Sequence, residues 1–154
     1  MRKVALITDG WRRLFTYAWP AGILQRIRET GEDVNLYIFN STGNWSRDAG
    51  YNRAEYNIYN LPELSDFDGI ILELNNISSP AVLADVISNA KRSGRPVVSI
   101  ANELGDFYYV GIDNYSAMKQ VIAHLHEVHD CKKFWLLVGA QDNYESSCRL
   151  QGML

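Results

Sequence analysis

Residues 108–117 read Tyr-Tyr-Val-Gly-Ile-Asp-Asn-Tyr-Ser-Ala, and the organisation of the chain turns on this stretch. Its first half is apolar enough for a short strand, and Ser116 in its second half is a residue type that opens helices. Strand-like and helix-like segments alternate before it, and the alternation starts again after it. We therefore expect a crossover between two α/β lobes, with Asp113 and Asn114 at the lobe boundary, where ligands of such proteins bind.

Four apolar runs before the crossover predict four strands. The expected strands are residues 3–8, 34–39, 69–74 and 97–101. Helices are expected from about Pro20 to Gly31 and from Ser79 to Gly94, because proline suits a first helical turn and glycine a helix end. Apolar strands alternating with helices are typical of a Rossmann-like parallel sheet with helices on both faces.

Two further segments complete the first half of the chain. Residues 11–16 are expected to form the loop after the first strand. Residues 47–59 are expected to form a helix in which Tyr51, Tyr56 and Tyr59 are partly buried, and the following proline ends it.

The sequence after the crossover begins a second α/β run. Residues 116–129 carry apolar side chains at helical spacing, residues 134–138 are expected to form another buried strand, and residues 144–154 begin a helix. We therefore divide the chain into a first α/β lobe, residues 1–108, and the crossover with the incomplete start of a second α/β lobe, residues 109–154.

The composition of the 154 residues excludes several classes of protein. A hydrophobic content of 47% argues against disorder, and a net charge of −3 with scattered basic residues argues against nucleic-acid contact. No apolar run approaches the ~20 residues of a membrane span, and no signal peptide is visible. Cys131 and Cys148 are too few for a disulfide framework. We expect a cytoplasmic chain with reduced thiols and no membrane contact.

Polar and aromatic residues gather where the expected strands end. The carboxyl ends of parallel strands meet at one edge of a sheet, which is where ligands bind. Amides and carboxylates can hydrogen-bond ligand hydroxyls, and aromatic rings can stack on a flat ligand surface. The predicted ligand-binding residues are Asp9, Phe15, Asn40, Asn75, Asn102, Asp113 and Arg149. The alternative is that Asn and Asp serve only the turns themselves.

Arg149 is the cation in this set. It lies in the first turns of the last expected helix, just after a loop at the end of an expected strand. A guanidinium there could make forked hydrogen bonds to hydroxyls, carboxylates or phosphates. The alternative is a surface arginine that pairs with Glu145.

Motifs for catalysis and cofactor binding are missing from the sequence. It contains no phosphate-binding loop, no dinucleotide-binding glycine pattern and no nucleophile elbow. Leu74-Asn75 stands where a response-regulator receiver would carry its phosphorylatable carboxylate. His124, His126 and His129 share a helix without further ligands at metal-binding spacing. We expect no catalytic residue, no metal and no cofactor.

Short motifs follow one another in an order that resembles the lac-repressor/periplasmic-binding-protein-like family, over essentially the whole chain. The motifs are Gly69-Ile-Ile-Leu, Pro96-Val-Val-Ser, Val110-Gly-Ile-Asp-Asn-Tyr-Ser-Ala117, His124-Leu125, Phe134 to Gly139 and Ser147-Cys-Arg-Leu-Gln-Gly152. A narrower resemblance is to sensor regions ahead of diguanylate cyclase domains in bacterial signalling proteins. It rests on Thr8-Asp-Gly-Trp-Arg-Arg, Tyr17-Ala-Trp, Phe39-Asn-Ser and Glu55-Tyr-Asn-Ile-Tyr-Asn-Leu-Pro.

The resemblance implies a two-lobed cytoplasmic sensor that closes on a sugar- or nucleoside-like ligand. It implies that Arg149 contacts the ligand and that Asp113 lies beside the pocket at the crossover. Closure would reorient a homodimer partner or a signalling output domain attached after the second lobe. The DNA-reading module usual in the family is missing before the first strand, so no direct nucleic-acid contact is expected.

Two other functions remain open at this stage. One is a dimerisation or interaction module that binds no ligand, in which the tyrosines of residues 47–59 supply an aromatic contact surface. The other is a small Rossmann-like enzyme with Asp9, Glu73 or Asp113 as its acid–base group, for which a strongly raised carboxyl pKa would be the sign.

Overall fold

Five parallel strands form one sheet in the computed structural model, in the order β2-β1-β3-β4-β5. Their bounds are β1 Arg2–Asp9, β2 Val34–Ser41, β3 Gly69–Glu73, β4 Val97–Ile100 and β5 Tyr108–Val110. The structure describes residues 1–10, 14–42, 46–75, 77, 79–139 and 143–154, and for residues 14–16 the backbone only. The predicted parallel α/β sheet is confirmed, and each of the four strands expected before the crossover is present.

β1 lies inside the sheet because its sequence is apolar on both faces. Ala5, Leu6 and Ile7 are all almost completely buried, as expected for a strand covered on both sides. The chain runs from β1 outward to β2 and then returns to β3 on the opposite side of β1. The strand order therefore reverses at β1, which marks the carboxyl edge there as the place where such sheets bind ligands.

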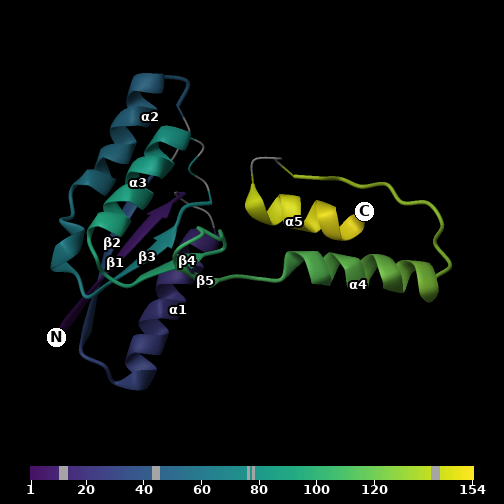
Figure 1. Cartoon of the computed structure of the whole chain (residues 1–154), viewed down its shortest axis with the longest axis horizontal. Coiled ribbons are helices and arrows are strands. Elements are labelled where there is room, and N and C mark those ends of the chain that lie inside the picture. The colour runs from purple at the N-terminus through teal and green to yellow at the C-terminus, as the bar shows by residue number, and fades with distance from the viewer. Residues whose placement is uncertain (11–13, 43–45, 76, 78, 140–142) are drawn as a thin grey trace.

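Helices cover both faces of the sheet (Figure 1). In this view α2 and α3 lie together on one side and α1 lies on the other. The elements are α1 Leu14–Thr30, α2 Ala49–Glu55, the 3₁₀ turns η1 Tyr56–Asn60 and η2 Leu64–Asp66, and α3 Pro80–Arg92. The α3 start agrees with expectation: Ser79 accepts a hydrogen bond from the Val82 backbone N–H, and Pro80 occupies the first turn.

Two boundaries in the first half differ from the sequence prediction. α1 begins at Leu14, so residues 14–16 are helical rather than loop and Pro20 lies inside the helix. A 17-residue helix tolerates the one backbone hydrogen bond that an internal proline removes. The expected helix over residues 47–59 is split into α2 and η1, where Tyr56 and Tyr59 are buried and Tyr51 is exposed.

Two helices, α4 (Asn114–Glu127) and α5 (Tyr144–Met153), form a separate arm beside the sheet (Figure 1). α4 begins two residues earlier than expected, because the Asp113 carboxylate rather than Ser116 caps it by accepting from the Ser116 N–H. The two helices pack against one another. No helix in the described ranges is both long enough and apolar enough to span a membrane.

The strand expected at residues 134–138 is wrong. The chain there is irregular, belongs to neither helix nor sheet, and leaves Trp135 and Leu137 100% and 99% exposed. Phe134, Leu136 and Val138 are less exposed than these two, so the strand-like alternation is present. A strand also needs a neighbouring strand for its hydrogen bonds, and the described residues place none beside this segment.

Close packing of α5 on α4 depends on Gly152, whose missing side chain leaves room for the backbone carbonyl of Tyr115. We predict that Gly152→Ala lowers the free energy of local opening of α5 by about 1–3 kcal/mol through overpacking, measured by native-state amide hydrogen exchange. The matched control is Gly22→Ala in α1, where an added methyl group meets no atom within 4 Å. That change should stabilise α1 by about 1 kcal/mol. Equal protection of α5 in Gly152→Ala and the wild type would contradict the packing role.

Candidate functional site

A buried polar cluster lies under the carboxyl ends of β1 and β2. Asp9 has no exposed surface, and its Oδ1 accepts a hydrogen bond of 2.6 Å from Ser41 Oγ. The Tyr59 hydroxyl donates to the Thr8 carbonyl oxygen at 2.9 Å and lies 3.1 Å from Ser41 Oγ. Burial, with the Asp9 charge nearby, raises the pKa of Tyr59, so its hydroxyl stays a donor. These bonds join η1 to the ends of both strands.

Glu73, the last residue of β3, extends this cluster. Its Oε2 accepts a hydrogen bond of 2.8 Å from the Thr8 hydroxyl, and its side chain is almost fully buried. Burial raises the pKa of Glu73, and the neighbouring Asp9 charge adds to the rise. A raised carboxyl pKa was the sign expected of an acid–base group, but this carboxyl is 4% exposed and bonded to Thr8. The shift therefore comes from packing inside the sheet.

A cavity of about 280 Å³ opens at the carboxyl ends of β3 and β4, where the first turn of α5 closes it. Its walls are Leu74, Asn75, Ile77, Leu83, Asn102, Asn143, Tyr144 and Ser147. Two of the predicted residues, Asn75 and Asn102, are brought together here from two strand ends. The Asn75 side chain also donates to the Ala101 carbonyl oxygen at 3.5 Å, which holds it across the gap between the strands.

The described wall residues of this cavity include polar but no charged side chains. Its polar side chains are three amides and two hydroxyls, and leucine and isoleucine form the rest of the wall. Amides and hydroxyls both donate and accept hydrogen bonds, which matches a ligand with several hydroxyl groups. Among the residues that the structure describes, none in the lining is a cation that would neutralise a phosphate or carboxylate.

Asp113 and Arg149 stand outside the cavity walls. Asp113 caps α4, and its hydrogen bond from the Ser116 backbone N–H lowers its pKa. Arg149 donates from one terminal nitrogen to Asn114 Oδ1 at 2.9 Å and from the other to Ser146 Oγ at 3.5 Å. The bond to Asn114, which is buried, ties α5 to the start of α4.

The remaining predicted residues lie nearer β1. Asn40 is in β2, where its side-chain nitrogen faces the Thr8 carbonyl oxygen at 3.3 Å. Phe15 lies in α1, and its side chain is outside the described residues. The seven predicted residues thus lie in four places, and their ligand contacts stay predictions: at the cavity (Asn75 and Asn102), at the ends of β1 and β2 (Asp9 and Asn40), in the arm and its cap (Arg149 and Asp113), and in α1 (Phe15).

Asn143, Tyr144 and Ser147 are wall residues that the candidate set missed. Asn143 caps α5 by accepting from the Ser146 N–H at 2.9 Å. An Asn ahead of an expected helix was a visible signal for a helix start. That this start faces the ends of β3 and β4 depends on how α5 is placed, which the local sequence pattern does not encode.

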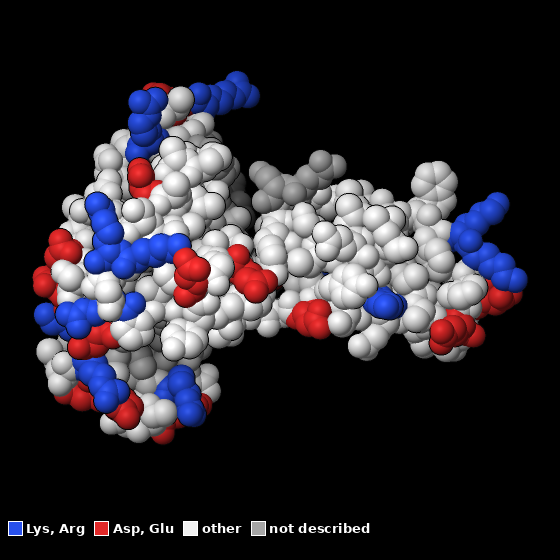
Figure 2. Space-filling view, viewed as in Figure 1, with Lys and Arg blue, Asp and Glu red and all other residues white. Residues whose placement is uncertain are grey.

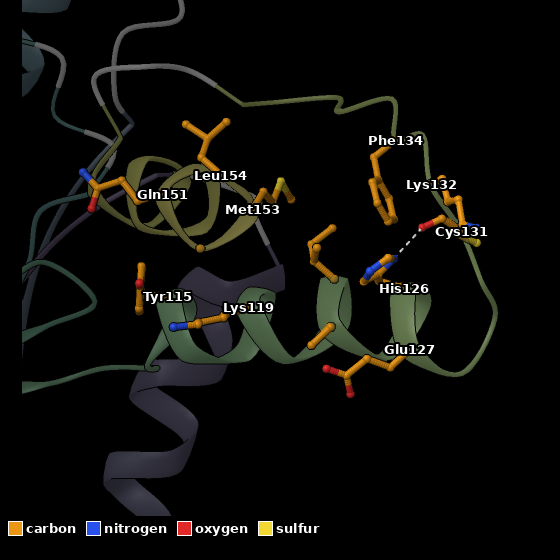
Figure 3. Close-up of a pocket in the computed structure, with 13 residues that line it drawn as sticks. Tyr115, Lys119, His126, Glu127, Cys131, Lys132, Phe134, Gln151, Met153 and Leu154 are labelled. Atoms are coloured by element: carbon orange, nitrogen blue, oxygen red, sulfur yellow. Dashed lines mark hydrogen bonds between the residues drawn. The ribbon is translucent and has the colours of Figure 1, made fainter.

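A larger hollow of about 690 Å³ lies elsewhere, between α4, α5 and the irregular segment (Figure 3). Tyr115, Lys119, His126 and Met153 are among its walls, and none of the predicted ligand-binding residues is. None of its described walls belongs to the sheet. Within the described ranges, no three His, Cys, Asp or Glu side chains gather in a way that could hold a metal ion.

Comparisons with known proteins identify the fold. No protein-family model matches the chain, and no curated protein matches it. Solved structures do match over almost all of it. One of them is a periplasmic solute-binding protein of an ABC transporter from Actinobacillus succinogenes 130z, with bound D-allose. It matches with a TM-score of 0.71 and 15% sequence identity, and the match covers 99% of this chain and 54% of that protein's chain.

Two further structures widen the comparison. One is a periplasmic-binding-protein/LacI transcriptional regulator from Alkaliphilus metalliredigens QYMF, complexed with D-xylulofuranose. Its TM-score is 0.63 at 17% sequence identity, and the match covers 99% of this chain and 50% of the regulator. Transcription regulator CcpA of Lactococcus lactis has a TM-score of 0.65 at 20% identity, with 99% and 51% covered. The chain therefore has the periplasmic-binding-protein/LacI-like fold, as the motifs implied, and spans about half the length of these proteins.

The pH dependence of stability tests the buried cluster. The native pKa of Glu73 is raised above its usual 4.5, so native Glu73 keeps a proton that the unfolded chain loses. The free energy of unfolding should therefore fall as pH rises from 4.5 to the native pKa. Glu73→Gln keeps an oxygen acceptor for Thr8 and cannot ionise. It should therefore remove the part of the pH-dependent decrease in unfolding free energy that comes from Glu73. At neutral pH the variant should be at least as stable as the wild type.

Urea unfolding across this pH range measures the effect. The matched control is Glu127→Gln at the exposed end of α4, which should leave the wild-type pH profile unchanged. An unchanged pH profile in Glu73→Gln would show that Glu73 does not titrate differently in the native state.

Proposed function

We propose that the chain is the ligand-sensing part of a bacterial signalling or transcription-regulatory protein and that its ligand is sugar- or nucleoside-like. The observation that carries the proposal is the cavity at the carboxyl ends of β3 and β4, closed by α5. Its walls come from the sheet on one side and from the arm on the other. A ligand that fills it contacts both parts, which is the requirement for coupling binding to their relative position.

The polar groups of the cavity support a hydroxyl-rich ligand. Asn75 and Asn102 present amides from the sheet, and Asn143 and Ser147 present an amide and a hydroxyl from α5. The apolar side chains of Leu74 and Leu83 supply a surface for the carbon face of a sugar or for a base. D-allose and D-xylulofuranose are the ligands bound in two proteins of similar fold, which supports the same class here.

Lobe closure is the proposed mechanism. Residues 1–108 form the first lobe, and residues 109–154 form the crossover and the start of the second. A ligand that prefers the closed arrangement shifts the population toward it, and the shift is transmitted to a homodimer partner or to an output domain.

The domain itself is not an enzyme in this proposal, acts in the cytoplasm, and contacts neither nucleic acid nor membrane. The proposal that it does not contact nucleic acid is supported by Figure 2, in which Lys and Arg are intermixed with Asp and Glu on the face shown.

A dimerisation module without a ligand is the second candidate. The observation in its favour is the full exposure of Trp135 and Leu137, because large exposed apolar side chains favour association. Light scattering that reports a monomer at high protein concentration would count against it.

Ligand binding can be tested with D-allose, D-glucose, D-ribose, L-arabinose and adenosine as probes. We predict that at least one raises the melting temperature and gives a calorimetric binding isotherm. Asn102→Ala should weaken that binding roughly fivefold to thirtyfold, since one hydrogen-bonding amide is lost. The matched control is Asn57→Ala, at an exposed position of η1 outside the cavity walls, which should bind as the wild type does.

Two results would overturn the sensor proposal at this cavity. One is the absence of any thermal shift with all five probes at millimolar concentration. The other is equal weakening of binding by the Asn102 and Asn57 substitutions, since the cavity would then not be the site.

A further inference from the structure

A hydrogen bond beside the cavity joins the arm to the sheet. The Tyr144 hydroxyl in the first turn of α5 donates to Glu103 Oε2, in the loop after β4, at 2.8 Å. Each partner follows a cavity residue along the chain, Asn143 and Asn102 respectively. The bond therefore spans the two parts of the molecule at the rim of the cavity.

An aromatic contact supports the same junction. The ring of Tyr109 in β5 meets the ring of Tyr144 edge-on, with centroids 6.4 Å apart and an interplanar angle of 83°. The Tyr109 hydroxyl lies over Gly111, so that even a methyl side chain at position 111 would overlap it. Gly111 belongs to the short connection between β5 and α4. Tyr109 thus contacts both the connection and the helix that it carries.

The protonation state of Tyr144 fixes it as the donor in this hydrogen bond and Glu103 as the acceptor. The hydrogen bond to Glu103 raises the pKa of Tyr144, so the phenol keeps its proton and acts as the donor. Burial, followed by the nearby Glu145, raises the pKa of Tyr109. Both phenols are therefore neutral across the physiological pH range.

We propose that Tyr144 and Glu103 form an interlobe latch that sets how much of the protein is in the closed arrangement. The cavity keeps its volume of about 280 Å³ with the bond in place, so latch and ligand are compatible. Because only the closed fraction binds with full affinity, the apparent dissociation constant is the intrinsic constant divided by that fraction. Tyr144 and Glu103 are thus positioning residues for the ligand, and this step rests on the proposed sensor function.

The latch can be tested without a ligand. Tyr144→Phe and Glu103→Met each remove the bond and keep a side chain of similar size, because phenylalanine lacks the donor and methionine lacks the oxygen acceptor. Tyr144→Phe also keeps the ring contact with Tyr109. Amide hydrogen exchange in residues 144–148 should rise roughly threefold to tenfold in each variant and no further in the double variant, because both changes remove the same interaction. The matched control is Tyr108→Phe in β5, whose side chain is 74% exposed.

A spectroscopic readout separates the latch from a general loss of structure. In a tyrosine-ring NMR titration, Glu103→Met should return the Tyr144 pKa toward 10, the usual phenol value, and leave the Tyr59 pKa raised. The latch would be overturned if the increases in amide hydrogen exchange caused by the two single substitutions added together in the double variant. It would also be overturned by a Tyr144 pKa that is unchanged in Glu103→Met.

The five ligand probes then separate the latch from the sensor function. Binding to the wild type that weakens roughly threefold to tenfold in both latch variants supports both proposals. Binding that is equally tight in the wild type and the latch variants overturns the latch and leaves the sensor function standing. If no probe binds, the sensor proposal fails at this cavity, and the exchange and NMR results decide whether the latch is real.

Discussion

The pairing of β1 with β2 on one side and β3 on the other is the interaction on which the candidate site depends. Parallel pairing aligns Thr8 with Asn40 and with Glu73, so three strand ends arrive at the same level. Polar side chains that are far apart in sequence meet there. β3 in turn positions β4, and the two place Asn75 and Asn102 on one wall of the cavity. A slip of one residue in β1 would turn its side chains to the opposite faces of the sheet.

Buried polar groups reinforce this edge at a cost that their hydrogen bonds offset. The carboxyl groups of Asp9 and Glu73 are almost completely buried. Asp9 accepts a hydrogen bond from the Ser41 hydroxyl, and Glu73 accepts one from the Thr8 hydroxyl. Tyr59 links the same strands to η1 through the Thr8 carbonyl oxygen. The small hydroxyl side chains at the ends of β1 and β2 therefore act as structural partners, whereas the strand-end side chains at the cavity are the amides of Asn75 and Asn102.

The sequence predicted the elements better than their tertiary partners. Apolar runs such as residues 3–8 and 69–74 predicted strands correctly, because strands buried on both faces are apolar without interruption. Asn75 and Asn102 share a cavity because parallel strand ends converge. The site roles of Asp113 and Arg149 depended on the position of α4 and α5, which local patterns do not encode, and the structure gives both residues partners within the arm. Residues 134–138 have the alternation of a strand but no described neighbour, so the pattern shows compatibility with a sheet and not membership in one.

The place of β1 in the sheet also has a consequence for biosynthesis. β1 leaves the ribosome before both of its sheet neighbours, and its edge toward β2 can pair once residues 34–41 have emerged. Its other edge must wait for β3, since Val4 pairs with Gly69 and Thr8 with Glu73. During that interval an apolar strand presents an open edge, the condition under which nascent chains aggregate or engage chaperones. The strand that organises the finished protein is thus also the one most exposed during its synthesis.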